Sequence, residues 1–62
     1  MSEDVKEQVK KLNARAIKLK MDLHDLAEEL PVGWEHIPDV AAATHTAFRD
    51  LAAARARLKK EE

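Results

Sequence analysis

The fold of this chain is decided by residues 5–30, which read VKEQVKKLNARAIKLKMDLHDLAEEL. Val5 begins a series of apolar residues spaced seven apart, and Val9 begins a second series that interleaves with the first. The combined spacing places both series on one face of an α-helix, as in helices that pack against a partner helix. We name this face the apolar seam of the helix. Its members are Val5, Val9, Leu12, Ala16, Leu19, Leu23, Leu26 and Leu30.

Both ends of this helix are marked in the sequence. The hydroxyl of Ser2 can accept a hydrogen bond from a free backbone N–H, and the acidic residues after it favour the positive end of the helix dipole. Pro31 disfavours helix at the residue before it, and Gly33 permits a tight turn. We therefore predict a helix over about residues 3–30 and a turn over residues 31–36.

The second half of the chain carries its own apolar seam with the same spacing. Its members are Ile37, Val40, Thr44, Ala47, Leu51, Ala54 and Leu58. Pro38 suits the first turn of a helix, so we predict a second helix over about residues 37–60. Because only a short turn connects two long helices, the helices must run antiparallel. Residues 1–62 are therefore predicted to form one all-α domain, an antiparallel two-helix hairpin.

A hairpin of 62 residues is small for a stable domain, because short chains bury a modest fraction of their surface. The sequence has no Cys, so disulfides and thiolate-bound metals cannot supply the missing stability. Association is the remaining common route. Two hairpins packed seam to seam would shield both seams from water. We therefore predict a homodimer in the form of a four-helix bundle.

The net charge is only −1, but the charges are sorted along the chain. Residues 5–20 carry a net charge of +5 and residues 49–60 a net charge of +4. Residues 21–48 contain no Lys or Arg and carry −6. In a hairpin the acidic segment forms the bend and the basic segments form the open end. Stacking two hairpins with their bends at opposite ends sets opposite charges side by side, so we predict this antiparallel arrangement.

The composition also disfavours several locations and activities. No apolar run approaches the roughly 18 residues of a membrane-spanning helix, and the N-terminal residues are acidic where a signal peptide would be basic. Together with the absence of Cys, this predicts a cytoplasmic protein. The chain has no cysteine nucleophile or glycine-rich phosphate loop, and a hairpin offers no deep pocket, so we expect no enzyme activity.

The best candidate for chemistry is His24 with Glu28, which lie four residues apart and so share one helix face. An imidazole and a carboxylate together suit a divalent transition metal ion. Two ligands bind weakly, so Asp25, His45 or a partner chain would have to complete the site. In the hairpin, His24 and His45 should lie within about two helical turns of each other. The alternative reading is a surface histidine beside solubilising acids.

Three apolar residues fall outside the packing pattern of the seams. Trp34 lies in the predicted turn, where we expect it to cover the end of the bundle core; the alternative is an exposed contact. Ile17 and Met21 lie off the first seam. They mark a strip for a partner, a contact in a tetramer, or ordinary scattered surface residues.

Residues 19–31, read with GWEHIP at 33–38 and with residues 40–51, resemble a family of small uncharacterised proteins encoded in nitrogen-fixation gene clusters. The most specific part is MDLHDLAE at residues 21–28, which runs into Leu30 and Pro31. The resemblance covers nearly the whole chain. It implies a Rop-like helical-hairpin dimer and an accessory role with metal binding, in which iron or nickel would be a fitting ion.

Three functions remain open at this point. The first is a non-enzymatic accessory or adaptor protein of nitrogen fixation, which binds a metal ion or docks on a protein that assembles the nitrogenase cofactor. The second is a Rop-like RNA-binding homodimer, which the net charge disfavours. The third is a purely structural oligomerisation module. In the RNA-binding homodimer, the side chains that contact RNA phosphates would be Lys10, Arg15, Lys18, Arg55 and Lys59.

Overall fold

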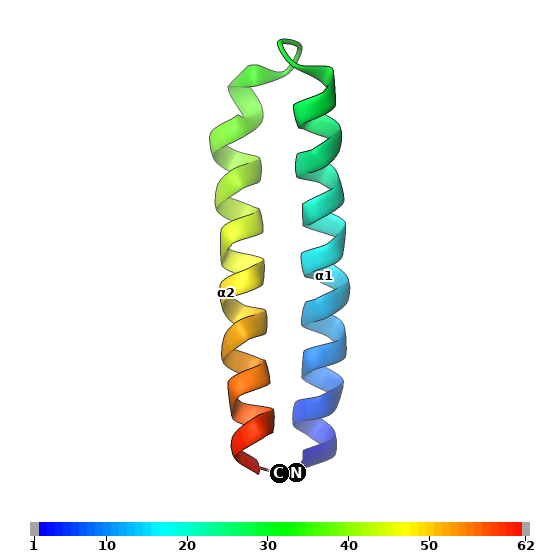
Figure 1. The fold of residues 1–62 in the computed structure, drawn as a ribbon, viewed down its shortest axis with the longest axis vertical. Coiled ribbons are helices and arrows are strands. Elements are labelled where there is room, and N and C mark those ends of the chain that lie inside the picture. The colour runs from blue at the N-terminus through cyan, green and yellow to red at the C-terminus, as the bar shows by residue number, and fades with distance from the viewer. Residues whose placement is uncertain (1, 62) are drawn as a thin grey trace.

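The chain is a long, thin helical hairpin, seen in a computed structural model that describes the backbone of residues 2–61 and the side chains of residues 4–60. Helix α1 spans Ser2–Glu29, the short 3-10 helix η1 spans Trp34–His36, and α2 spans Ile37–Glu61. The two α-helices lie side by side and antiparallel, with the bend at one end and both termini at the other (Figure 1). The predicted all-α hairpin is confirmed, and no strand occurs within residues 2–61. Over its described residues, neither α1 nor α2 is long and apolar enough to cross a membrane.

The helix ends follow from the residues found there. Helix α1 already includes Ser2 and ends at Glu29, whereas the sequence predicts about residues 3–30. The predicted cap by the Ser2 side chain falls outside the described side chains. Helix α2 begins at Ile37, so Pro38 lies in the first turn, where its missing N–H leaves no helical hydrogen bond unmade.

The bend is held by backbone hydrogen bonds and by one glycine. The N–H of Val32 donates to the carbonyl of Glu29 at 3.0 Å, and the N–H of His36 donates to the carbonyl of Gly33 at 2.9 Å. Gly33 adopts a left-handed conformation with φ of 80°, which L side chains rarely accept. A Cβ atom there would also lie only 3.2 Å from Leu26 Cδ1. The bend therefore requires glycine at this position.

The core of the hairpin lies where the two seams meet, and it is built largely from small side chains. Ala16 of α1 packs with Ala47 and Leu51 of α2, and the partly buried Val9, Leu12 and Leu19 lie against this cluster. The buried apolar residues are Val5, Ala16, Ala47, Leu51 and Ala54, all of them predicted seam members. Most leucines of the α1 seam are only partly buried, so one hairpin leaves part of this seam open to water.

Thr44 is the polar member of the α2 seam, and the structure shows how its hydroxyl is satisfied. Thr44 Oγ1 lies 2.8 Å from the carbonyl oxygen of Val40, one turn earlier, and 3.3 Å from that of Leu19 on α1. The hydroxyl group can therefore donate its one proton to either of these two carbonyl oxygens. This contact also fixes the register of the helices, because it sets Thr44 beside Leu19.

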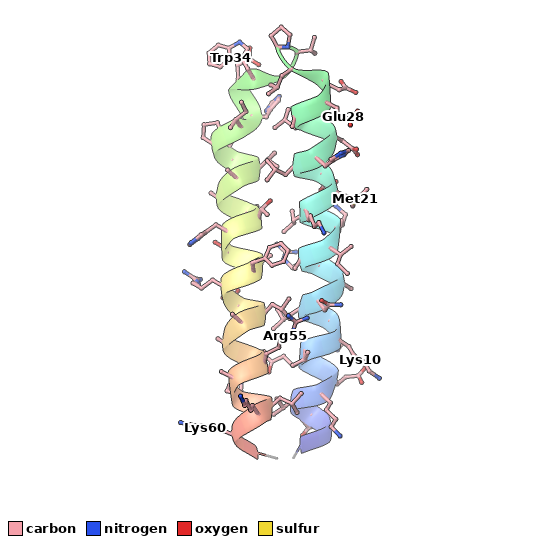
Figure 2. The ribbon with its side chains drawn as sticks, in the orientation of Figure 1. Lys10, Met21, Glu28, Trp34, Arg55 and Lys60 are labelled. Carbon is pink, nitrogen blue, oxygen red and sulfur yellow. The ribbon has the colours of Figure 1, made fainter. Side chains whose placement is uncertain are left out.

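Near the bend, the last residue of the α1 seam and the first residue of the α2 seam are more exposed than the periodicity predicts. Leu30 follows the end of α1 rather than lying within it, and Ile37 begins α2, so neither packs inside the helix pair. The expected place of Trp34 over the core of a two-hairpin bundle stays a prediction, but Trp34 does not cover the end of the single hairpin, because it is 61% exposed. The cause is η1, which carries Trp34 on the outside of the bend (Figure 2).

We expect Leu51→Ala to lower the free energy of unfolding by about 2–4 kcal/mol, because Leu51 is 3% exposed and the large side chain fills the centre of the core. The matched control is Ile17→Ala, since Ile17 is half-exposed on α1. Its effect should stay below about 1 kcal/mol. Urea denaturation followed by circular dichroism measures both. Equal losses in the two variants would contradict the assignment of the core.

Candidate functional site

His24 is the centre of a small exposed cluster on α1 near the bend. Its Nε2 atom lies 3.3 Å from Glu28 Oε1, one helical turn further on. Its Nδ1 atom lies 3.7 Å from Asp25 Oδ1. All three side chains are well exposed, and Glu28 points away from α2 into solvent (Figure 2). These contacts are ion pairs only when the imidazole is protonated, and at such exposure they add little stability.

The two carboxylates approach different nitrogens of the ring. A metal ion bound through Nε2 of His24 could share its coordination with Glu28, whereas Asp25 lies at the opposite nitrogen. A single ion would therefore gain two ligands from this cluster rather than three. Among the side chains that the structure describes, no group of three or more His, Asp or Glu residues is arranged to hold a metal ion.

His45, the other predicted histidine ligand, lies at a different position from His24 along the axis of the hairpin. The contact between Thr44 and Leu19 sets the register of the two helices. His24 lies five residues beyond Leu19 toward the bend, and His45 lies one residue beyond Thr44 away from the bend. At a rise of 1.5 Å per residue, they are separated by about 9 Å along the helix axis. One hairpin therefore does not bring His24 and His45 to one ion.

The basic side chains near the open end are partly engaged within the hairpin. Arg55 donates from Nη2 to Asn13 Oδ1 at 3.2 Å, and Arg57 donates from Nη1 to Gln8 Oε1 at 3.2 Å. Figure 2 shows Arg55 reaching from α2 across to α1. Lys18 lies 3.2 Å from Asp22 on its own helix. Contacts with RNA phosphates through Lys18 or Arg55 would have to compete with these interactions.

Ile17 and Met21 stay about half-exposed, as expected for residues off the seam. Met21 lies on the side of α1 that faces away from α2 (Figure 2). Because they are spaced four residues apart, the two side chains form one small apolar strip on the outer face of α1.

Sequence reasoning missed two sets of contact residues. The cross-helix pairs of Arg55 with Asn13 and of Arg57 with Gln8 depend on the register of the helices, which periodicity alone does not give. The second set is the exposed apolar side chains of the bend, including Val32. Their signal was present in the sequence, as apolar residues beside Pro31 and Gly33 within a segment that lacks basic residues.

Comparison with known proteins places this chain in a family. The sequence profile described as Rop-like matches residues 2–62. A UPF0437 protein of Azorhizobium caulinodans is 45% identical over 60 residues, which cover 97% of this chain and 87% of the relative. A UPF0437 protein of Nostoc sp. is 47% identical over 60 residues, with 97% and 84% coverage.

The name of a third relative also states where its gene lies. The Frankia alni protein is named as a UPF0437 protein in the nifX-nifW intergenic region, and it is 46% identical over 55 residues. Those residues cover 89% of this chain and 67% of the relative. No solved structure matches the chain significantly. These matches confirm the resemblance seen in the sequence: the chain belongs to the Rop-like family of small helical proteins, which the position of the Frankia relative links to nitrogen fixation.

Proposed function

We propose that this chain is a non-enzymatic accessory protein of nitrogen fixation that acts as an adaptor in the form of a homodimeric four-helix bundle. The observation that carries the proposal is the position of the Frankia relative between nifX and nifW, in a protein 46% identical to this chain. The geometry supports an adaptor rather than an enzyme, because the polar groups of the candidate cluster lie on an open helix surface.

The half-open seam supports the homodimer. Three of the five buried apolar residues are alanines, which bury little area, and the α1 leucines inside the helix keep one side exposed. A second copy offers a seam of the same length and spacing. With the bends at opposite ends, the acidic residues 21–48 of one copy lie along the basic residues 5–20 and 49–60 of the other.

Deletion of the gene in a nitrogen-fixing host tests the biological role. We expect slower growth and lower acetylene reduction when dinitrogen is the nitrogen source, and normal growth on ammonium. Expression of the wild-type chain from a plasmid should restore both. Equal growth of the deletion strain and its parent under nitrogen-fixing conditions would contradict the proposal.

Metal binding at His24 and Glu28 is the second part of the proposal, with a divalent iron or nickel ion as the cofactor. The 3.3 Å distance between Nε2 and Oε1 supports a shared ion at these two side chains, and a partner protein would complete the coordination. The site as a whole would then form only when the adaptor is docked. The isolated protein should accordingly bind such ions weakly.

We expect His24→Ala to weaken the binding of Fe(II), Ni(II) or Zn(II) by about tenfold, since it removes the nitrogen ligand of the pair. Equilibrium dialysis of the isolated protein under anaerobic conditions measures the change. His36→Ala is the matched control, because His36 is an exposed histidine in η1, outside this cluster. Equally weak binding by wild type and His24→Ala would remove the metal from the proposal.

A further inference from the structure

The bend presents more apolar surface than any other part of the hairpin. Four large apolar side chains within eight consecutive residues are exposed there. The exposed fractions are 40% for Leu30, 69% for Val32, 61% for Trp34 and 38% for Ile37. Single exposed apolar residues are ordinary, but a contiguous group with a tryptophan is typical of protein contact sites. We name these four side chains the bend surface.

The backbone under the bend surface is fixed before any partner arrives. Hydrogen bonds from Val32 to Glu29, from Trp34 to Pro31 and from His36 to Gly33 close the bend. The ring of Pro31 further restricts the backbone. A binding loop that is already ordered loses less conformational entropy on docking, so its apolar contacts translate more fully into affinity.

The Asp and Glu residues within and next to the bend surface in the sequence are exposed, and no basic Lys or Arg lies among them. Glu28, Glu29, Glu35 and Asp39 are all exposed. No Lys or Arg occurs between residues 21 and 48. A complementary partner therefore has an apolar pocket rimmed by Lys and Arg, because opposite charges at the rim speed encounter and reject wrong partners.

A second copy of this chain does not match that description. The open end of the hairpin is basic, and the exposed large apolar side chains nearest to it among the described residues are Ile17 and Phe48, which lie near the middle of α1 and α2. The turns next to the open end thus offer charge without an apolar surface to receive Trp34. Seam-to-seam pairing covers the length of the helices and leaves each bend at an end of the bundle.

From these observations we propose that the bend surface docks into an apolar pocket, rimmed by Lys and Arg, on a different protein. The proposal rests on the adaptor role above and assigns that role to one surface. A homodimer with bends at opposite ends carries two such surfaces. The adaptor therefore engages a partner at each end of the bundle.

Trp34 makes the proposal measurable, because it is the one tryptophan of the chain. The probe is a synthetic amphipathic helical peptide with a leucine face flanked by lysines, and the matched probe has glutamate in place of lysine. We expect the lysine peptide to shift Trp34 emission to shorter wavelength as the indole leaves water. Raising the salt concentration should weaken this binding, and the glutamate peptide should leave the emission unchanged.

Two pairs of variants separate the apolar and charged parts of the contact. Val32→Ser should weaken binding of the lysine peptide by about tenfold, while Ile17→Ser, at an exposed apolar residue far from the bend, should leave it unchanged. Glu35→Lys should weaken binding by about fivefold, while Glu7→Lys, with the same change in net charge, should have little effect. All four positions are exposed, so the helical content should be retained.

Several results would overturn the proposal. They are an unchanged Trp34 emission with the lysine peptide, an equal response to both peptides, or equal affinity of Val32→Ser and Ile17→Ser. Emission that shifts on dilution of the protein alone while the helical content stays constant would show that a second copy covers the bend, which also overturns it. None of these outcomes depends on the growth phenotype of the deletion strain, so the two proposals fail separately.

Discussion

Close packing of α1 against α2, where Ala16 meets Ala47 and Leu51, is the contact on which the rest of the molecule depends. Alanine at these positions lets the helix backbones approach closely, and the approach aligns the cross-helix pairs at the open end. The same alanines bury little apolar area. Leu51 is fully covered, but the α1 leucines around this contact are only partly covered, and a hairpin that folds by this contact still carries a partly open α1 seam.

This division of surface would let so short a chain serve both proposed contacts. The seams run along the helices and would pair with a second copy, whereas the bend lies at the end and would stay clear of that pairing. The charge pattern supports both arrangements, because an acidic bend complements the basic open end of another copy and also the basic rim of a different protein. The His24 cluster lies between these regions on the outer surface of α1.

The sequence predicted the hairpin well, because seven-residue spacing and the residues Pro31, Gly33 and Pro38 act locally. It predicted the buried members of both seams for the same reason. It did not predict that Trp34 points outward, since that depends on the short 3-10 helix that follows Gly33. The separation of His24 and His45, about 9 Å along the axis, agrees with the expected distance of within about two helical turns, but the sequence did not give the register, which contacts such as Thr44 with Leu19 define. The pairing of His24 with Glu28 followed directly from helical spacing.

The central claim is that the apolar surface left uncovered along the seams needs a second copy of the chain to shield it from water. Sedimentation equilibrium at micromolar concentration, with circular dichroism on the same samples, tests this claim most directly. The account predicts a helical species of twice the chain mass of 7.0 kDa, which loses helix as it dissociates on dilution. A fully helical monomer of 7.0 kDa that unfolds cooperatively would contradict it.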